Sequence, residues 1–118
     1  MLTIDFETAK KHLTAAVEER GADFTYQPRG AICLYQFEGK ADCGVGEVFA
    51  RSGVNMEANF FESSVANSCR VDLLNLDGLT EPFSIEPKAL DFLLRFQSRQ
   101  DQFVSWGDAL ESALYETA

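Results

Sequence analysis

The chain has 118 residues, of which 46% are hydrophobic and 25% charged, and its formal net charge at pH 7 is −9. This composition indicates one globular domain and not a disordered chain, and the acidic excess argues against direct nucleic-acid binding, which needs clustered lysine and arginine. No apolar run approaches the roughly 20 residues of a membrane span, and the first residues lack the features of a secretion signal, so we expect a cytoplasmic protein.

The first predicted helix follows Asp5 and ends at Gly21. Apolar residues recur at intervals of three and four from Phe6 to Val17, which indicates one buried helix face. Asp5 is a typical N-cap, and glycine commonly ends a helix in the left-handed conformation. His12, the only histidine, adjoins this face, and we expect it at the surface or at the boundary of the core.

A β-hairpin is predicted next, with strands at residues 24–26 and 31–37. Aromatic and branched residues flank a turn that contains proline and glycine, a pattern typical of paired strands. Because a two-stranded ribbon is marginal in water by itself, helices must cover it.

A short helix is predicted to open at Asp42 and to stop at Gly53, with Cys43 in its first turn. Gly44 and Gly46 each cost such a helix roughly 1 kcal/mol relative to alanine. We therefore expect them to permit close contact with the preceding strand or with a ligand, and packing is the favoured interpretation.

Residues 55–82 show the least regular pattern. The segment 59–68 is rich in serine and asparagine, which predicts a surface loop. Phe60 and Phe61 lie at its base, and we interpret them as candidate contacts for a partner.

The end of the chain predicts a helical hairpin. Phe92 and Phe96 belong to the apolar face of its first helix, which breaks near residues 102–104. Ser105 is a typical N-cap for the second helix, whose inward stripe includes Trp106.

The predicted fold is therefore α+β: one compact domain, residues 1–118, in which a small antiparallel hairpin packs against four to five short helices. The predicted core consists of Phe6, Leu13, Val17, Ile32, Leu34, Val48, Phe49, Leu74, Phe92, Leu93, Phe96, Trp106 and Leu110.

The cysteines allow two kinds of chemistry. The chain has three of them, and an odd number without close pairs indicates reduced thiols. A thiol at a helix N-terminus is activated by the helix dipole, so Cys43 with His12 is the candidate for a reactive thiol. A zinc site from Cys33, Cys43, Cys69 and His12 is disfavoured because structural zinc sites usually have close ligand pairs.

The remaining catalytic motifs are missing. Gly44-Val45-Gly46 lacks the third glycine and the strand–helix setting of a dinucleotide loop. Phosphate-binding loops with lysine, the Gly-x-Ser-x-Gly elbow and His-Glu-x-x-His do not occur either. We therefore expect no enzyme, no cofactor and no metal.

Acidic residues concentrate in the second part of the chain. Residues 71–118 contain nine Asp and Glu against three Lys and Arg. This excess either keeps the protein soluble or docks a basic partner in competition with nucleic acid. The candidate partner-binding residues are Phe60, Phe61, Asp101, Phe103, Asp108 and Glu111.

Two blocks of residues resemble a known group of proteins. The first block is Cys33-x-Tyr35, Gly39, Cys43-x-Val45-Gly46 and Gly53-Val54, and the second is Gln97-x-x-Gln100-Asp101 with Trp106-Gly107-x-Ala109-Leu110. The pattern is similar to that of small proteins of actinobacteria and their phages. In that pattern, Pro-Ser would replace Ala41-Asp42, and glycine would replace Phe103. The resemblance implies a phage accessory protein and supplies no catalytic residues.

Three hypotheses follow from the sequence. The leading one is a non-enzymatic acidic module that binds a host or defence protein with a basic surface. The second is a thiol-dependent enzyme or redox sensor that uses Cys43. The third is a homodimeric structural protein that associates through its C-terminal helical hairpin.

Overall fold

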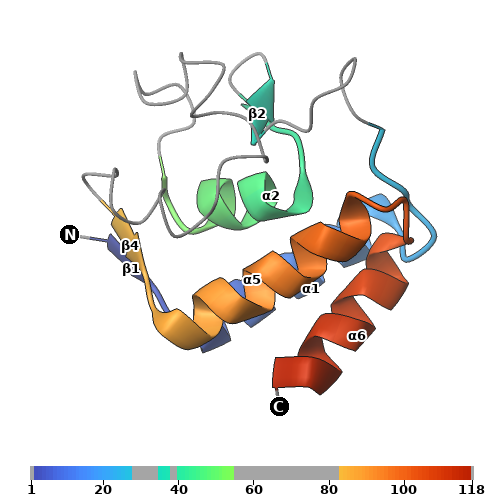
Figure 1. The fold of residues 1–118 in the computed structure, drawn as a ribbon. Coiled ribbons are helices and arrows are strands. Elements are labelled where there is room, and N and C mark those ends of the chain that lie inside the picture. Colours follow the sequence, from blue (N-terminus) through green and yellow to red (C-terminus); the bar gives the residue numbers. More distant parts are fainter. Residues whose placement is uncertain (1, 28–34, 38–39, 55–82, 118) are drawn as a thin grey trace.

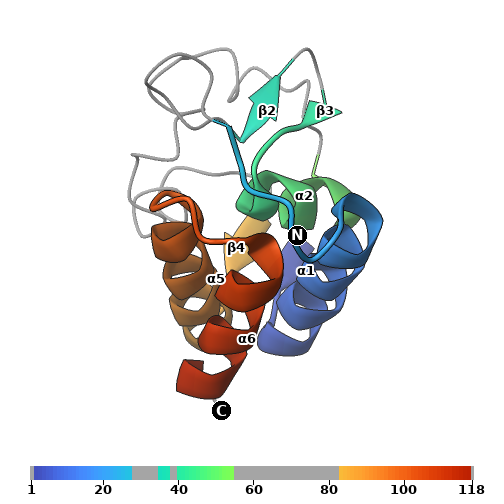
Figure 2. The same cartoon turned by 90° about the vertical axis from the view of Figure 1, so that its right-hand side faces the viewer.

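The computed structural model describes residues 2–27, 35–37, 40–54 and 83–117 (Figure 1). Four helices dominate these residues: α1 (Phe6–Arg20), α2 (Gly44–Arg51), α5 (Pro87–Gln100) and α6 (Trp106–Thr117). The strands are short: β1 (Leu2–Ile4), β2 (Gln36–Phe37), β3 (Lys40–Ala41) and β4 (Phe83–Ile85). Figures 1 and 2 show α1, α5 and α6 side by side, with α2 lying over α1 and α5.

The predicted α+β fold with an antiparallel hairpin is wrong. The described part of the chain is mostly helical, and β1 pairs in parallel with β4, with Leu2 opposite Phe83. Residues 24–26 form no strand, because the carbonyl of Phe24 instead accepts the N–H of Trp106 at 2.8 Å. The antiparallel pairing that the described residues contain is limited to β2 and β3, two residues each. Residues 31–34 of the second predicted strand lie outside the described residues.

The prediction for the first helix and its N-cap is confirmed. The Asp5 carboxylate accepts the N–H of Thr8 at 2.7 Å, and Gly21 follows the helix with a positive φ of 100°, although its ψ of 142° differs from the expected left-handed helical conformation. The buried face includes Ala9, Leu13 and Val17. Local signals were sufficient here because the caps and the apolar period agree.

Most of the predicted core is buried. Leu13, Val17, Val48, Phe49, Phe92, Leu93, Phe96, Trp106 and Leu110 are buried, and Phe6 is half-buried against them. Ile32, Leu34 and Leu74 lie outside the described residues. The centre contains an edge-to-face series in which Trp106 is 4.7 Å from Phe24 and 5.8 Å from Phe96, measured between ring centroids.

The glycines of α2 permit close packing, as predicted. A Cβ atom on Gly46 would lie 1.9 Å from the carbonyl oxygen of Tyr35, and one on Gly44 would lie 2.2 Å from Cε1 of Phe96. The helix begins one residue later than predicted, because Cys43 and not Asp42 is its N-cap.

Arg20 joins three segments at the end of α1. Its guanidinium pairs with Glu47 of α2 at 2.8 Å and donates to the carbonyl of Asp42 at 3.0 Å. The same group lies 5.1 Å from the ring centroid of Trp106 at the start of α6. One side chain therefore fixes the ends of α1, α2 and α6 relative to one another.

The predicted C-terminal helical hairpin is present as α5 and α6. Ser105 Oγ accepts the N–H of Asp108 at 3.4 Å, which is the predicted N-cap contact. The N–H of Gly107 donates to the carbonyl of Ala22 at 2.8 Å, so the segment after α1 satisfies a further amide of the α6 N-terminus. This packing leaves the opposite side of α6 toward solvent.

Candidate functional site

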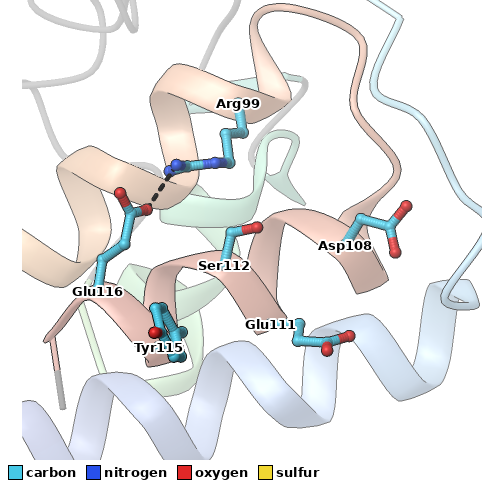
Figure 3. Close-up of a pocket in the computed structure, with 6 residues that line it drawn as sticks. All are labelled: Arg99, Asp108, Glu111, Ser112, Tyr115 and Glu116. Carbon is cyan, nitrogen blue, oxygen red and sulfur yellow. Dashed lines mark ion pairs between the residues drawn. The ribbon is translucent and has the colours of Figure 1, made fainter.

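The outer face of α6 is the candidate site. Asp108, Glu111, Ser112 and Tyr115 recur at helical spacing and so share one face, opposite the buried Trp106, Ala109 and Ala113. These four residues, together with Glu116 and with Arg99 of α5, line an open groove with a volume of about 710 Å³ (Figure 3).

The positive charge in the groove is already engaged. Glu116 pairs with Arg99 at 2.5 Å and with Arg95 at 3.3 Å, as the dashed line in Figure 3 shows for Arg99. These pairs hold the last turn of α6 on α5 and offset the repulsion between the Glu116 carboxylate and the negative end of the helix dipole. Arg99 therefore contributes little positive field to an incoming ligand.

Two carboxylates of the groove remain unpaired. Among the described residues, Asp108 and Glu111 make no ion pair, and α6 itself contains no lysine or arginine. Asp108 lies in the first turn of α6, where its negative charge also stabilises the helix. Glu111 lies about one turn further from the N-terminus of α6, so the helix dipole stabilises its negative charge less than that of Asp108. The Glu111 side chain is exposed to solvent.

Tyr115 adds an aromatic surface to the acidic face. Tyr115 is 85% exposed, so its ring is not part of the packing among the described residues. An exposed tyrosine beside carboxylates can stack on an apolar side chain or on a guanidinium group. The groove thus presents carboxylate and aromatic groups, the two classes that contact arginine and lysine most effectively.

The structure places the four described partner-binding candidates in two places. Asp108 and Glu111 lie in the groove, whereas Asp101 and Phe103 are exposed in the turn between α5 and α6. Phe60 and Phe61 lie outside the described residues. Partial burial raises the pKa of the Asp101 carboxyl, and a hydrogen bond from Gln100 acts in the opposite direction.

Sequence reasoning missed the remaining groove residues, which are Arg99, Ser112, Tyr115 and Glu116. A usable signal existed for Ser112 and Tyr115. The predicted inward stripe of the last helix leaves both residues on the outward side. The ion pair between Arg99 and Glu116 joins two helices and had no local signal.

Cys43 is buried, as the packing interpretation expects. Its Sγ accepts the N–H of Gly46 at 3.4 Å at the start of α2. Burial is the main cause that raises the pKa of the thiol from 9.0 to about 12, so burial outweighs the helix dipole. In this conformation the thiol stays protonated at neutral pH, and a reactive-thiol function would require α2 to open.

His12 is half-buried on α1. Burial lowers the pKa of its imidazole, and the positive charges of Lys11 and Arg51 lower it further. The neutral form is therefore favoured at pH 7. The neighbouring positive charges disfavour the imidazolium form of His12, and that is the form that would stabilise a reactive thiolate.

Within residues 2–27, 35–37, 40–54 and 83–117, no group of His, Cys, Asp and Glu side chains is arranged to hold a metal ion. No helix of that same part has the length and apolarity to cross a membrane. The chain matches no protein-family model, and comparison with curated proteins and with solved structures gave no significant match.

Proposed function

We propose that this protein is a non-enzymatic, acidic protein-binding module, and that the groove on α6 engages a basic surface of another protein. The observation that carries the proposal is the pair of unpaired carboxylates, Asp108 and Glu111, on one helix face with the exposed Tyr115. Solubility accounts for exposed acids, and the exposed ring among them adds a surface on which a guanidinium group can stack.

The partner should carry arginine and lysine side chains at helical or extended spacing. Arginine suits the face best, because its planar guanidinium can pair with a carboxylate and stack on tyrosine at the same time. A surface of that kind is also one that binds nucleic acid. The module would then compete with nucleic acid for the partner.

The biological setting is a second part of the proposal. The resemblance to small proteins of actinobacteria and their phages supports an accessory protein that acts on a host or defence protein. The −9 net charge supports the electrostatic mode of binding, because long-range attraction speeds encounter with a basic protein.

Affinity capture from a bacterial lysate tests the proposal with a matched pair of variants. Glu111→Lys and Glu18→Lys each change the net charge by the same amount, and both residues are exposed on helices, but Glu18 lies on α1 and not in the groove. The reversal at Glu111 should weaken capture of a basic protein about tenfold or more, the equivalent of about 1.4 kcal/mol, since close interfacial charge pairs couple strongly.

Salt provides the second arm of the test. Capture by the wild-type protein and by Glu18→Lys should decline together as salt rises from about 0.05 M to 0.5 M, because ions screen the attraction. Equal loss in both variants would contradict recognition by the groove. Capture that ignores salt would contradict the electrostatic proposal.

A further inference from the structure

The turn between α5 and α6 holds an aromatic residue in a conformation that favours glycine. Phe103 has a φ of 64°, and it is the non-glycine residue with positive φ in the part of the chain that the structure describes. Side chains with a Cβ atom are strained in this region, which glycine and asparagine tolerate best.

The backbone around Phe103 requires that conformation. The N–H of Phe103 donates to the carbonyl of Gln100 at 3.0 Å, and the N–H of Val104 donates to the carbonyl of Arg99 at 3.1 Å. These two bonds form a Schellman motif that ends α5, and the residue at the position of Phe103 is usually glycine. The turn therefore has a structural reason for its shape but no structural reason for an aromatic ring.

The turn is also rigidly connected to the core. Gln100 is only 1% exposed, and its Oε1 accepts the N–H of Gly44 at 2.9 Å, which ties the end of α5 to the start of α2. The ring of Phe103, in contrast, is 59% exposed. A ring that is presented from a fixed turn loses little conformational entropy when it is buried by a partner.

We propose that Phe103 is an aromatic anchor that enters an apolar pocket on the partner, with basic residues of the partner around it. This inference rests on the proposed function and adds a second contact point to the α6 groove. Asp101 in the same turn supplies negative charge that the basic rim would meet, with one carboxylate oxygen, Oδ1, already accepting a hydrogen bond from Gln100 at 3.1 Å. Buried aromatic anchors surrounded by polar contacts contribute a large share of the affinity in protein interfaces.

A second copy of this chain fits the turn less well than a basic partner does. A two-fold contact centred on Phe103 would bring two copies of Asp101 together, and like charges across an interface are unfavourable. The proposal therefore commits to a different protein with a basic, pocketed surface.

Three variants separate recognition from folding. Phe103→Gly and Phe103→Ala both remove the ring, but only glycine relieves the backbone, so the glycine variant should have a folding constant about fivefold higher than the alanine variant. Phe103→Tyr keeps the ring. The proteins are immobilised and used for capture from bacterial lysate, and their unfolding is followed in urea.

The expected result is a loss of capture of at least tenfold in both Phe103→Gly and Phe103→Ala, although only glycine relieves the turn, with capture retained in Phe103→Tyr. Capture that follows stability, retained in the glycine variant and lost in the alanine variant, would show a structural role and overturn the inference alone. Unchanged capture in both variants would do the same and leave the groove proposal intact. A wild-type protein that captures nothing would overturn both the Phe103 inference and the groove proposal. A wild-type dimer that Phe103→Gly converts to a monomer would overturn the inference of a different partner, because the occupant would then be a second copy of this chain.

Discussion

Replacing Gly46 by alanine tests how α2 is held against the segment before it. The new Cβ atom would lie 1.9 Å from the carbonyl oxygen of Tyr35, whereas ordinary contact begins at 3.4 Å, so the two groups must separate by about 1.5 Å. The obstacle is a backbone atom, and no side-chain rotation can remove it. Either α2 moves as a unit or the backbone at Tyr35 does.

Both movements disturb other contacts. The carbonyl of Tyr35 accepts the N–H of Asp42 at 3.0 Å, and the Tyr35 ring lies 5.4 Å from that of Phe49. Overpacking a core costs typically 1–3 kcal/mol, and a weakened buried hydrogen bond adds about 1 kcal/mol. Alanine regains about 1 kcal/mol through its higher helix propensity. The net loss should be about 1–3 kcal/mol, a substantial part of the roughly 5–15 kcal/mol stability of a small domain.

Urea unfolding followed by tryptophan fluorescence measures this loss, because Trp106 is buried in the core. The midpoint should fall with little change in slope, and the melting temperature should fall by about 4–12 °C, since 1 kcal/mol corresponds to about 4 °C at this size. Alanine at position 46 with stability equal to or above the wild type would refute the packing explanation, because helix propensity would then be the larger effect.

Two further predictions concern the core. Cys43 should react with iodoacetamide only through unfolding, because the folded protein encloses the thiol and keeps it protonated, and alkylation of Cys43 as fast in the native protein as in urea would contradict its burial. Because the thiol pKa is higher in the folded state than in the unfolded chain, the protein should lose stability as pH rises from 9 toward 12, and Cys43→Ser should reduce that loss. Arg20→Met removes the 2.8 Å pair with Glu47 and two hydrogen bonds to backbone carbonyls, and should cost about 2–3 kcal/mol in the same urea assay. Unfolding at the wild-type midpoint would argue against Arg20 as the residue that joins the three helices.

Helices were the part of the fold that the sequence predicted well. The face of α1, the caps at Asp5 and Ser105, and the inward stripes of α5 and α6 all depend on residues within one or two turns of each other. The periodicity of apolar residues reports such local order directly. The close approach at Gly44 and Gly46 was also predictable, because glycine is otherwise unfavourable inside a helix.

The strands were predicted wrongly because their pairing is not local. β1 and β4 lie about eighty positions apart in the chain, and nothing in either segment indicates the other. Phe24 and Tyr26 have a strand-like composition, but the backbone of Phe24 contacts the start of α6 and the hydroxyl of Tyr26 donates to Asp42. Composition alone does not distinguish these two uses of an aromatic residue.

The acidic residues of the site were predicted from the sequence, but the groove that they line was not. Asp108 and Glu111 were identified from the acidic excess of residues 71–118. The groove depends on how α5 and α6 pack and on the ion pair between Arg99 and Glu116, both of which join residues on different helices. The contact of Gln100 with the α2 N-terminus likewise had no signal in the sequence.

Site-specific photocrosslinking gives the most direct test of the α6 groove as the partner-binding site. A photoreactive phenylalanine analogue would replace Tyr115 in the groove or, as the control, the exposed Lys10 on α1, and the protein would be irradiated in bacterial cells. A partner bound in the α6 groove should give a discrete adduct with a basic protein from position 115, weakened by Glu111→Lys, and none from position 10. Adducts of equal yield from both positions, or an adduct only from position 10, would contradict binding in the groove.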